Sequence, residues 1–167
     1  MNRRNLLLGL GAAIAAGGAA LALRPRGAAS VTGTFEIEKS DAEWRRLLTP
    51  EQYDVLRRHA TEPSFTSPLN DEHRPGVFAC AGCDLPVYDA SAKFDSGTGW
   101  PSFFQPLPNA IATSTDQSWL GERTEVHCRR CGGHLGHVFD DGPPPTGLRY
   151  CMNGVALKFT PAPAAAS

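Results

Sequence analysis

The spacing of apolar residues divides the chain into a helical part and a β part, which meet near Pro75. In the first part the apolar positions recur at helical intervals, and Ser40 and Thr49 stand where helix N-caps are expected. Glu43 follows Ser40 at capping-box spacing, and Pro50 suits the first position of a second helix. The pattern predicts two short helices, joined tightly as a hairpin that packs on the outside of the main body.

Beyond Pro75 the texture of the sequence changes. Gly and Pro become frequent, apolar runs shorten, and helical periodicity disappears. Short alternating runs between turn residues are typical of β-strands. We therefore expect a mainly β (α+β) fold with a mostly antiparallel body over residues 75–160. The expected strands are 77–79, 85–88, 119–120, 124–126, 148–150 and 155–159.

The first 30 residues have the order of an export signal. Arg3 and Arg4 precede an apolar run over residues 6–23, rich in Ala and Gly, and small residues follow. The adjacent arginines resemble the twin-arginine type, which carries folded cargo. An uncleaved membrane anchor is the alternative, since the run approaches the length of a bilayer span. Its low hydrophobicity favours the signal, so we expect a periplasmic protein.

Length and charge narrow the classes further. The 167 residues fit one domain, for which we expect residues 40–160, a linker over 31–39 and a disordered tail over 161–167. The formal net charge is −1, and without the four arginines of residues 1–29 it is −5, from 12 basic and 17 acidic residues. An acidic body argues against nucleic acid as a partner, because phosphate binding needs a basic surface. We expect a monomer.

Four of the five cysteines form two C-x-x-C pairs. Two residues between thiolates let both sulfurs point inward from one tight turn, and two facing turns make a tetrahedral Cys₄ site that suits one structural Zn²⁺. The pairs are Cys80 with Cys83 and Cys128 with Cys131. We expect Gly82 and Gly132 to supply the backbone freedom of the turns. Disulfides, a redox-active pair and an iron–sulfur cluster are the alternatives.

The fifth cysteine, Cys151, has no partner by this count. A buried, inert thiol is the simplest interpretation. If the segment is a strand, however, Arg149 and Asn153 project to the same face as Cys151, and a guanidinium near a thiol favours the thiolate.

Two histidines, His134 and His137, stand three residues apart between glycines. They could be metal ligands, but with four cysteines already available they are better interpreted as acid/base residues or polar pocket walls. Trp100, flanked by Gly99 and Pro101, is interpreted as a side chain that a loop holds in a defined position, rather than as a core residue. His59 and His73 are isolated in the sequence and receive no role.

Several blocks of this sequence together resemble one family, the methionine sulfoxide reductases of the B type, which act on the R epimer. The blocks are residues 80–83, 94–103, 128–141 and 149–153. The resemblance covers about residues 40–160. It implies a β body of two antiparallel sheets, open and barrel-like, with peripheral helices.

The resemblance also implies roles for individual residues. Cys151 is similar to the nucleophile that attacks the sulfoxide sulfur and becomes a sulfenic acid. His137 and His134 are similar to the family residues that supply the proton. Asn153, Asp141 and Arg149 are similar to those that orient the site. Trp100 is similar to the residue that receives the substrate methyl group. The implied substrates are oxidised proteins or peptides containing methionine-R-sulfoxide.

Two positions depart from the family pattern. Thr98 stands where many members have the cysteine that resolves the sulfenic acid as a disulfide, so we expect a thioredoxin-like or small-thiol reductant to act directly. Gly154 stands in place of a common serine, and we expect a small effect. Two functions compete with this one. The chain could be a zinc-ribbon-like interaction module without catalysis, or a redox sensor that acts through Cys151.

Overall fold

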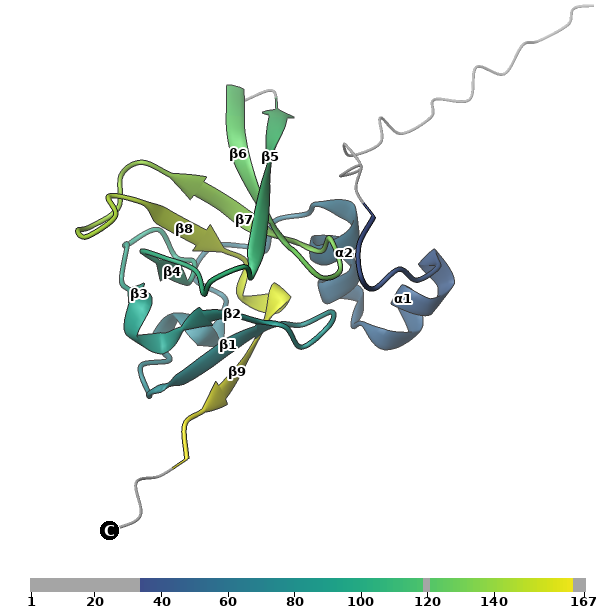
Figure 1. Cartoon of the computed structure of the whole chain (residues 1–167), viewed down its shortest axis with the longest axis horizontal. Helices are drawn as coiled ribbons and strands as arrows, with labels where there is room; N and C mark the ends of the chain where they lie inside the picture. Colours follow the sequence, from purple (N-terminus) through teal and green to yellow (C-terminus); the bar gives the residue numbers. More distant parts are fainter. Residues whose placement is uncertain (1–33, 119–120, 164–167) are drawn as a thin grey trace, which may run out of the picture.

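The computed structural model describes residues 34–118 and 121–163, which fold into two antiparallel sheets with a pair of helices to one side (Figure 1). The expected export signal and the expected strand at residues 119–120 lie outside the described residues. Among the helices that the structure describes, none has the length and apolar character needed to span a membrane.

The helical hairpin forms as its caps predict. Helix α1 (Asp41–Leu47) and helix α2 (Pro50–Arg58) both begin with a complete capping box, the second one closed by Gln52. The two boxes satisfy N–H groups that a helix of this length would otherwise leave unpaired. Trp44 and Leu56 are buried, and α2 contacts strand β7 of the larger sheet. The hairpin therefore closes one end of the β body.

The two sheets are separate hydrogen-bonded ladders. The smaller sheet has the order β2-β1-β9, and the larger has the order β3-β4-β8-β7-β6-β5, all antiparallel. The strands of the smaller sheet are β1 (Gly76–Cys80), β2 (Pro86–Asp89) and β9 (Leu157–Pro161). Those of the larger are β3 (Lys93–Phe94), β4 (Ser102–Phe103), β5 (Ile111–Ser118), β6 (Gly121–Cys128), β7 (His134–Phe139) and β8 (Arg149–Met152). The body is open, as expected, and is not a closed barrel.

The core lies where the sheets face each other. Phe103 of β4 stacks on Tyr88 of β2 with ring centroids 4.2 Å apart, and its edge contacts Phe78 of β1 at 5.0 Å. All three rings are fully buried. Burial of such rings stabilises the fold by roughly 2 kcal/mol each and fixes the larger sheet against the smaller one.

Three 3₁₀ turns complete the fold: η1 (Pro68–Asp71), η2 (Ala90–Ala92) and η3 (Gly154–Ala156). The expectation of a strand from residue 155 is wrong at its start, because Val155 and Ala156 belong to η3. Of the residues expected to form the tail, Pro161 ends β9, and Ala162 N–H donates to Pro75 C=O at 2.8 Å.

Candidate active site

The ladder registers place Cys151 in one transverse row of side chains on the larger sheet. Residues directly opposite in antiparallel strands project to the same face, with Cβ atoms about 5 Å apart. Cys151 is opposite His137 on β7 and opposite Ser102 on β4. The full row, from β3 to β5, is Phe94, Ser102, Cys151, His137, Glu125 and Ser114. Cross-strand pairing alone therefore puts a thiol, an imidazole and a carboxyl group side by side.

A β-bulge adds His134 to this face. In a regular strand, residues three apart project to opposite faces. The register of β6 with β7 shifts so that His127 is opposite His134 while Val126 is opposite Gly136, which leaves Leu135 extra. His134 and His137 consequently share one face, and their rings meet edge to face with centroids 5.4 Å apart. The carbonyl of Leu135 accepts hydrogen bonds from Asn153 N and Nδ2, at 2.8 and 3.1 Å.

Glu125 fixes His134. The His134 Nδ1 lies 2.8 Å from Glu125 Oε1, and Ser114 Oγ donates to Oε2 at 2.6 Å. Burial of Glu125 opposes its ionisation, but the hydrogen bonds from His134 and Ser114 outweigh it and lower the pKa to about 2. Because an ionised carboxylate only accepts, Nδ1 of His134 carries the proton. His134 Nε2 is buried with no hydrogen-bond partner among the described residues, so its lone pair is an unsatisfied acceptor.

His59, which sequence reasoning left without a role, joins this cluster. Its Nδ1 lies 3.2 Å from Glu125 Oε1, and its ring stacks on that of His134 at 5.0 Å. By distance the three residues could hold a metal ion. The two rings, however, are within 21° of parallel, so their in-plane nitrogens do not converge on one point. The hydrogen bond of His134 to Glu125 and the close approach of His59 to the same oxygen account for the arrangement.

His137 is paired with a different acid. Its Nε2 lies 2.7 Å from Asp116 Oδ2, which also accepts from Arg123 at 2.6 Å. Burial raises the pKa of Asp116, but the hydrogen bonds from His137 and Arg123 bring it below its usual value. Burial lowers the pKa of His137 despite Asp116. His137 is therefore neutral near pH 7, with its proton on Nε2 and Nδ1 free to accept one.

Arg149 lies beside Cys151, as the strand alternation predicts. Its guanidinium makes two 2.8 Å bonds to Asp141 and stacks over Phe139 at 4.4 Å. The pKa of Arg149 is raised, first by the hydrogen bond to Asp141 and also by the negative charge that Cys151 can carry. Arg149, Asp141 and Cys151 thus form one group at strand β8.

Glu62, a residue that the sequence did not single out, joins three parts of the site. Its carbonyl accepts from Trp100 Nε1 at 3.0 Å, and its N–H donates to Asn153 Oδ1 at 3.0 Å. Its buried carboxyl group accepts the N–H groups of Gly154 and Val155, at 2.5 and 2.9 Å. One loop residue therefore holds the tryptophan, the asparagine and the turn that follows Cys151.

The packing at Gly154 leaves no room for a side chain unless Ser67 moves. A Cβ at this position would lie 1.8 Å from Ser67 Oγ and 2.6 Å from Ser67 Cβ. A serine here therefore requires Ser67 to move, so the exchange of serine for glycine is not a small change in this chain.

Glu62 and Glu125 left no local sequence signal, because their partners are distant in the chain. For Glu125 one indication was available. Its carboxylate lies on the inward face of the expected strand 124–126, and a buried carboxylate needs a partner. Asp116 lies on β5, a strand that the sequence did not predict.

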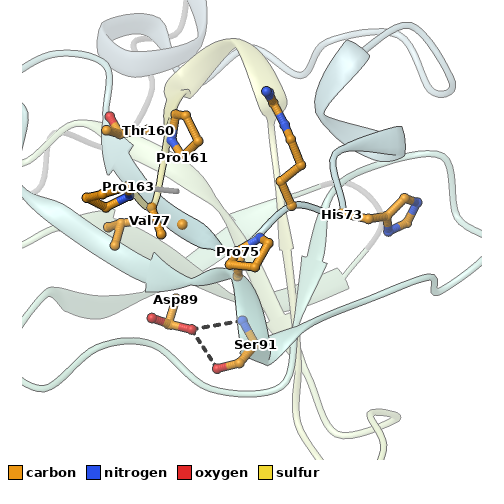
Figure 2. Close-up of a pocket in the computed structure, with 12 residues that line it drawn as sticks. His73, Pro75, Val77, Asp89, Ser91, Thr160, Pro161 and Pro163 are labelled. Atoms are coloured by element: carbon orange, nitrogen blue, oxygen red, sulfur yellow. Dashed lines mark hydrogen bonds between the residues drawn. The ribbon is translucent and has the colours of Figure 1, made fainter. Parts of the chain in front are cut away.

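The described surface includes hollows at two places. One, of about 180 Å³, is lined by Trp100, Phe65, Phe94 and Lys93, among others. Phe65 is 73% exposed, so an aromatic surface beside Trp100 faces solvent. The other, of about 590 Å³, is open and lined mainly by the β1–β9 end of the smaller sheet (Figure 2). None of Cys151, His134 and His137 lines either hollow.

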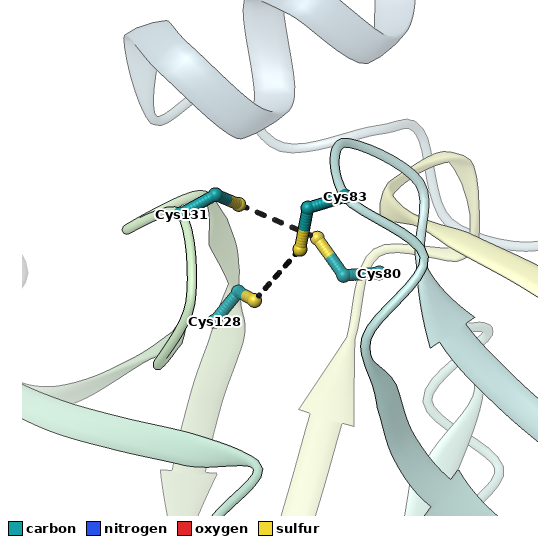
Figure 3. A group of neighbouring side chains, drawn as sticks. All are labelled: Cys80, Cys83, Cys128 and Cys131. Atoms are coloured by element: carbon teal, nitrogen blue, oxygen red, sulfur yellow. Dashed lines mark hydrogen bonds between the residues drawn. The ribbon is translucent and has the colours of Figure 1, made fainter. Parts of the chain in front are cut away.

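The four remaining cysteines converge between the sheets (Figure 3). The Sγ atoms of Cys80 and Cys131 lie 3.7 Å apart, those of Cys83 and Cys128 lie 3.5 Å apart, and all four fit within 4.8 Å. These gaps exclude disulfides, whose sulfurs lie about 2.05 Å apart. A zinc–thiolate tetrahedron with bonds of about 2.3 Å has edges of about 3.8 Å, so the cluster has the arrangement of a zinc site. Hydrogen bonds from the other thiols, Cys131 first, hold the pKa of Cys128 well below its usual range.

Each C-x-x-C turn connects two strands of a different sheet. The first joins β1 to β2 and the second joins β6 to β7, so the cluster links the two sheets. The expectation that Gly82 relieves the first turn is wrong. The residue after the second cysteine is left-handed in both turns: Asp84 at φ 57° and Gly132 at φ 65°. Gly132 is confirmed in that role, and a Cβ there would overlap Phe35.

Cys151, the cysteine outside the cluster, thus lies beside His137 on one face of the larger sheet. Comparison with known proteins gives the family. The SelR domain model matches residues 48–161, more than half of the chain. The chain belongs to the SelR family, the B-type peptide methionine sulfoxide reductases.

The curated relatives agree along nearly their whole length. A peptide methionine sulfoxide reductase MsrB of Agrobacterium fabrum is 53% identical over 127 residues, covering 75% of this chain and 94% of its own. Those of Leptospira interrogans and Thiobacillus denitrificans are 49% and 54% identical and cover 75% and 74% of this chain, with 96% and 94% of their own. The Mis18 'Yippee-like' domain overlays 55% of this chain and all of its own, with 21% identity and a TM-score of 0.45.

Proposed function

We propose that this chain reduces methionine-R-sulfoxide in oxidised proteins and peptides to methionine, with Cys151 as the nucleophile. The observation that carries the proposal is the transverse row, which places the one cysteine outside the metal-type cluster beside His137 and, through the bulge, near His134. Family membership supports the same reaction.

The proposed first step is attack of the Cys151 thiolate on the sulfoxide sulfur. A sulfoxide is a poor electrophile until its oxygen is protonated, so the site must supply a proton. Neutral His137 takes the thiol proton on Nδ1 and delivers it to the oxygen, and the ring of His134, held by Glu125, lies against the ring of His137. The balance is one thiol and one sulfoxide giving one thioether and one sulfenic acid on Cys151.

The remaining site residues orient the substrate in this proposal. Trp100, anchored by Glu62, supplies an apolar wall for the substrate methyl group. Asn153 and the Arg149–Asp141 pair supply polar contacts around the sulfoxide oxygen. The aromatic surface next to Trp100 suits a side chain presented by a peptide.

Regeneration requires an external thiol in this proposal. The other four cysteines lie in the cluster, and position 98 carries a threonine whose Oγ1 is 3.8 Å from Cys151 Sγ. Two external thiols, small or on a thioredoxin-like protein, reduce the sulfenic acid and leave as a disulfide with one water.

The cysteine cluster is proposed to hold one structural Zn²⁺ through Cys80, Cys83, Cys128 and Cys131. The donor set fits: four sulfurs at tetrahedral spacing and no open position for a substrate. The metal would cross-link the sheets and take no part in the reaction.

The cellular location remains a proposal from the first 30 residues. A twin-arginine signal would deliver the folded, metal-loaded protein to the periplasm, or hold it at the membrane if uncleaved. Nothing in the acidic body calls for nucleic acid.

The test is turnover of a peptide methionine-R-sulfoxide with dithiothreitol, by the domain and its Cys151→Ser variant, with the S epimer as substrate control. We expect turnover of the R epimer alone, lost in the variant while zinc stays at one per chain. A well-folded, zinc-loaded wild type without turnover would overturn the proposal.

A further inference from the structure

Three hydroxyl groups connect Cys151 to a backbone carbonyl. Thr98 Oγ1 lies 3.8 Å from Cys151 Sγ and 2.8 Å from Ser96 Oγ, which lies 2.7 Å from Ser102 Oγ. Ser102 in turn donates to the carbonyl of Trp100 at 3.1 Å. Ser102 is fully buried and opposite Cys151 in the β4–β8 ladder, so the far end of this hydroxyl chain is fixed by the sheet.

The direction of the hydroxyl chain follows from counting hydrogens. A carbonyl cannot donate, so Ser102 spends its single O–H on Trp100 and must accept from Ser96. Ser96 has then used its own hydrogen and accepts from Thr98. Thr98 is left with lone pairs toward Cys151, and the sulfur side must provide the hydrogen. The hydroxyl chain therefore presents an acceptor to the site.

We propose that Thr98, aligned by Ser96 and Ser102, accepts the O–H of the sulfenic acid formed on Cys151 and holds it protonated until the reducing thiol arrives. This rests on the proposed function. An oxygen bound to Sγ would lie between the two atoms, and a bent S–O–H···O arrangement with an oxygen–oxygen distance of about 2.7 Å spans the observed 3.8 Å.

The alternative, that Thr98 donates to an anion on Cys151, has a structural cost. Thr98 would have to turn its hydrogen away from Ser96, and reversing the rest of the chain breaks the bond from Ser102 to Trp100. The arrangement therefore favours the protonated sulfenic acid over the sulfenate. The sulfenate is the form that peroxide oxidises further, so Thr98 protects the intermediate from irreversible sulfinic acid formation.

The test separates formation of the intermediate from its fate. Wild type, Thr98→Val and Thr98→Ser are each mixed with excess methionine-R-sulfoxide without reductant. Methionine release is counted per chain, and dimedone labelling measures the sulfenic acid. Hydrogen peroxide is then added, and sulfinic acid on Cys151 is followed by mass spectrometry. We expect sulfinic acid to form about two- to tenfold faster in Thr98→Val, the effect of one lost hydrogen bond, and Thr98→Ser to restore the wild-type rate.

Ser96→Ala tests the direction itself, at a residue that does not touch the sulfur. Without Ser96 as acceptor, Thr98 is free to donate to the sulfenate, so sulfinic acid should again form faster although Thr98 is present. Equal rates in wild type, Thr98→Val and Ser96→Ala would overturn the inference, provided that each releases one methionine per chain. Absence of methionine release and of dimedone adduct in wild type would instead refute the proposed function.

Discussion

Replacing Glu62 by Gln tests whether one buried carboxyl group holds the turn after Cys151. Glu62 is 6% exposed and accepts two backbone N–H groups, those of Gly154 and Val155. Gln keeps one acceptor oxygen and turns an NH₂ group toward the other N–H, which is left unsatisfied. Hydrogen bonds to a charged group contribute about 1.5–3 kcal/mol each, so the expected loss is about 2–3 kcal/mol.

The loss should appear in both stability and activity. At about 4 °C per kcal/mol for a domain of this size, Tm should fall by about 10 °C. Asn153 and Trp100 keep their bonds to the Glu62 backbone but lose the fixed turn beneath them, so kcat/KM should fall about tenfold, which equals about 1.4 kcal/mol. Glu62→Ala removes both acceptors and should cost more than Gln. Calorimetry and steady-state turnover measure the two effects.

A matched control is available at Glu122, an exposed carboxylate that bonds only a side chain, Gln117, among the contacts described. Glu122→Gln should change stability by less than about 0.5 kcal/mol. If Glu62→Gln falls in the same range, the assignment of Glu62 as the anchor of this turn is wrong.

Three further perturbations have defined outcomes. The pKa of Glu125 is about 2 in the folded chain against 4.5 normally, so its contribution to the free energy of unfolding is present above pH 4.5 and is lost as pH falls toward 2. The unfolding free energies of wild type and Glu125→Gln should therefore converge by about 3 kcal/mol over that window. A constant gap between them would contradict this. Gly154→Ser should cost about 1–3 kcal/mol, less in a Ser67→Gly background, whereas additive costs in a double-mutant cycle would exclude the predicted clash. Removing zinc with a chelator, or changing Cys83 to Ser, should destabilise the chain by about 5 kcal/mol, while Cys151→Ser retains the metal; equal Tm before and after measured zinc loss would rule out the cross-link.

The sequence predicted best those features that depend on neighbouring residues. Both helices begin where their caps indicate, because the N-cap side chain and the N–H group that donates to it lie within four residues of each other. The C-x-x-C pairs are equally local, although the prediction for Gly82 failed because the left-handed residue of that turn is Asp84, two residues later. The sequence contains no comparable signal for β5, an edge strand with many polar residues, or for β7, where glycines interrupt the apolar pattern.

The candidate site divides in the same way. Family blocks marked Cys151 and its closest companions, but the acids that bind the two histidines come from the β5–β6 hairpin and are specified only by pairing. Asp116 lies 21 residues from His137, and Glu62 lies 92 residues from Gly154. Such partners become visible when strand register is known, because a buried carboxyl group reveals its role through what it contacts.

The transverse row has a consequence for how this molecule can be handled. Its six members come from six strands, so a slip of one residue in any one ladder would move one of them through the sheet to the opposite face. Deleting Leu135 would remove the bulge and, with it, the carbonyl that accepts two hydrogen bonds from Asn153. Turnover would therefore certify the register of five ladders at once, which makes the assay for chemistry the most demanding available check on refolded material, stricter than helix content or bound metal.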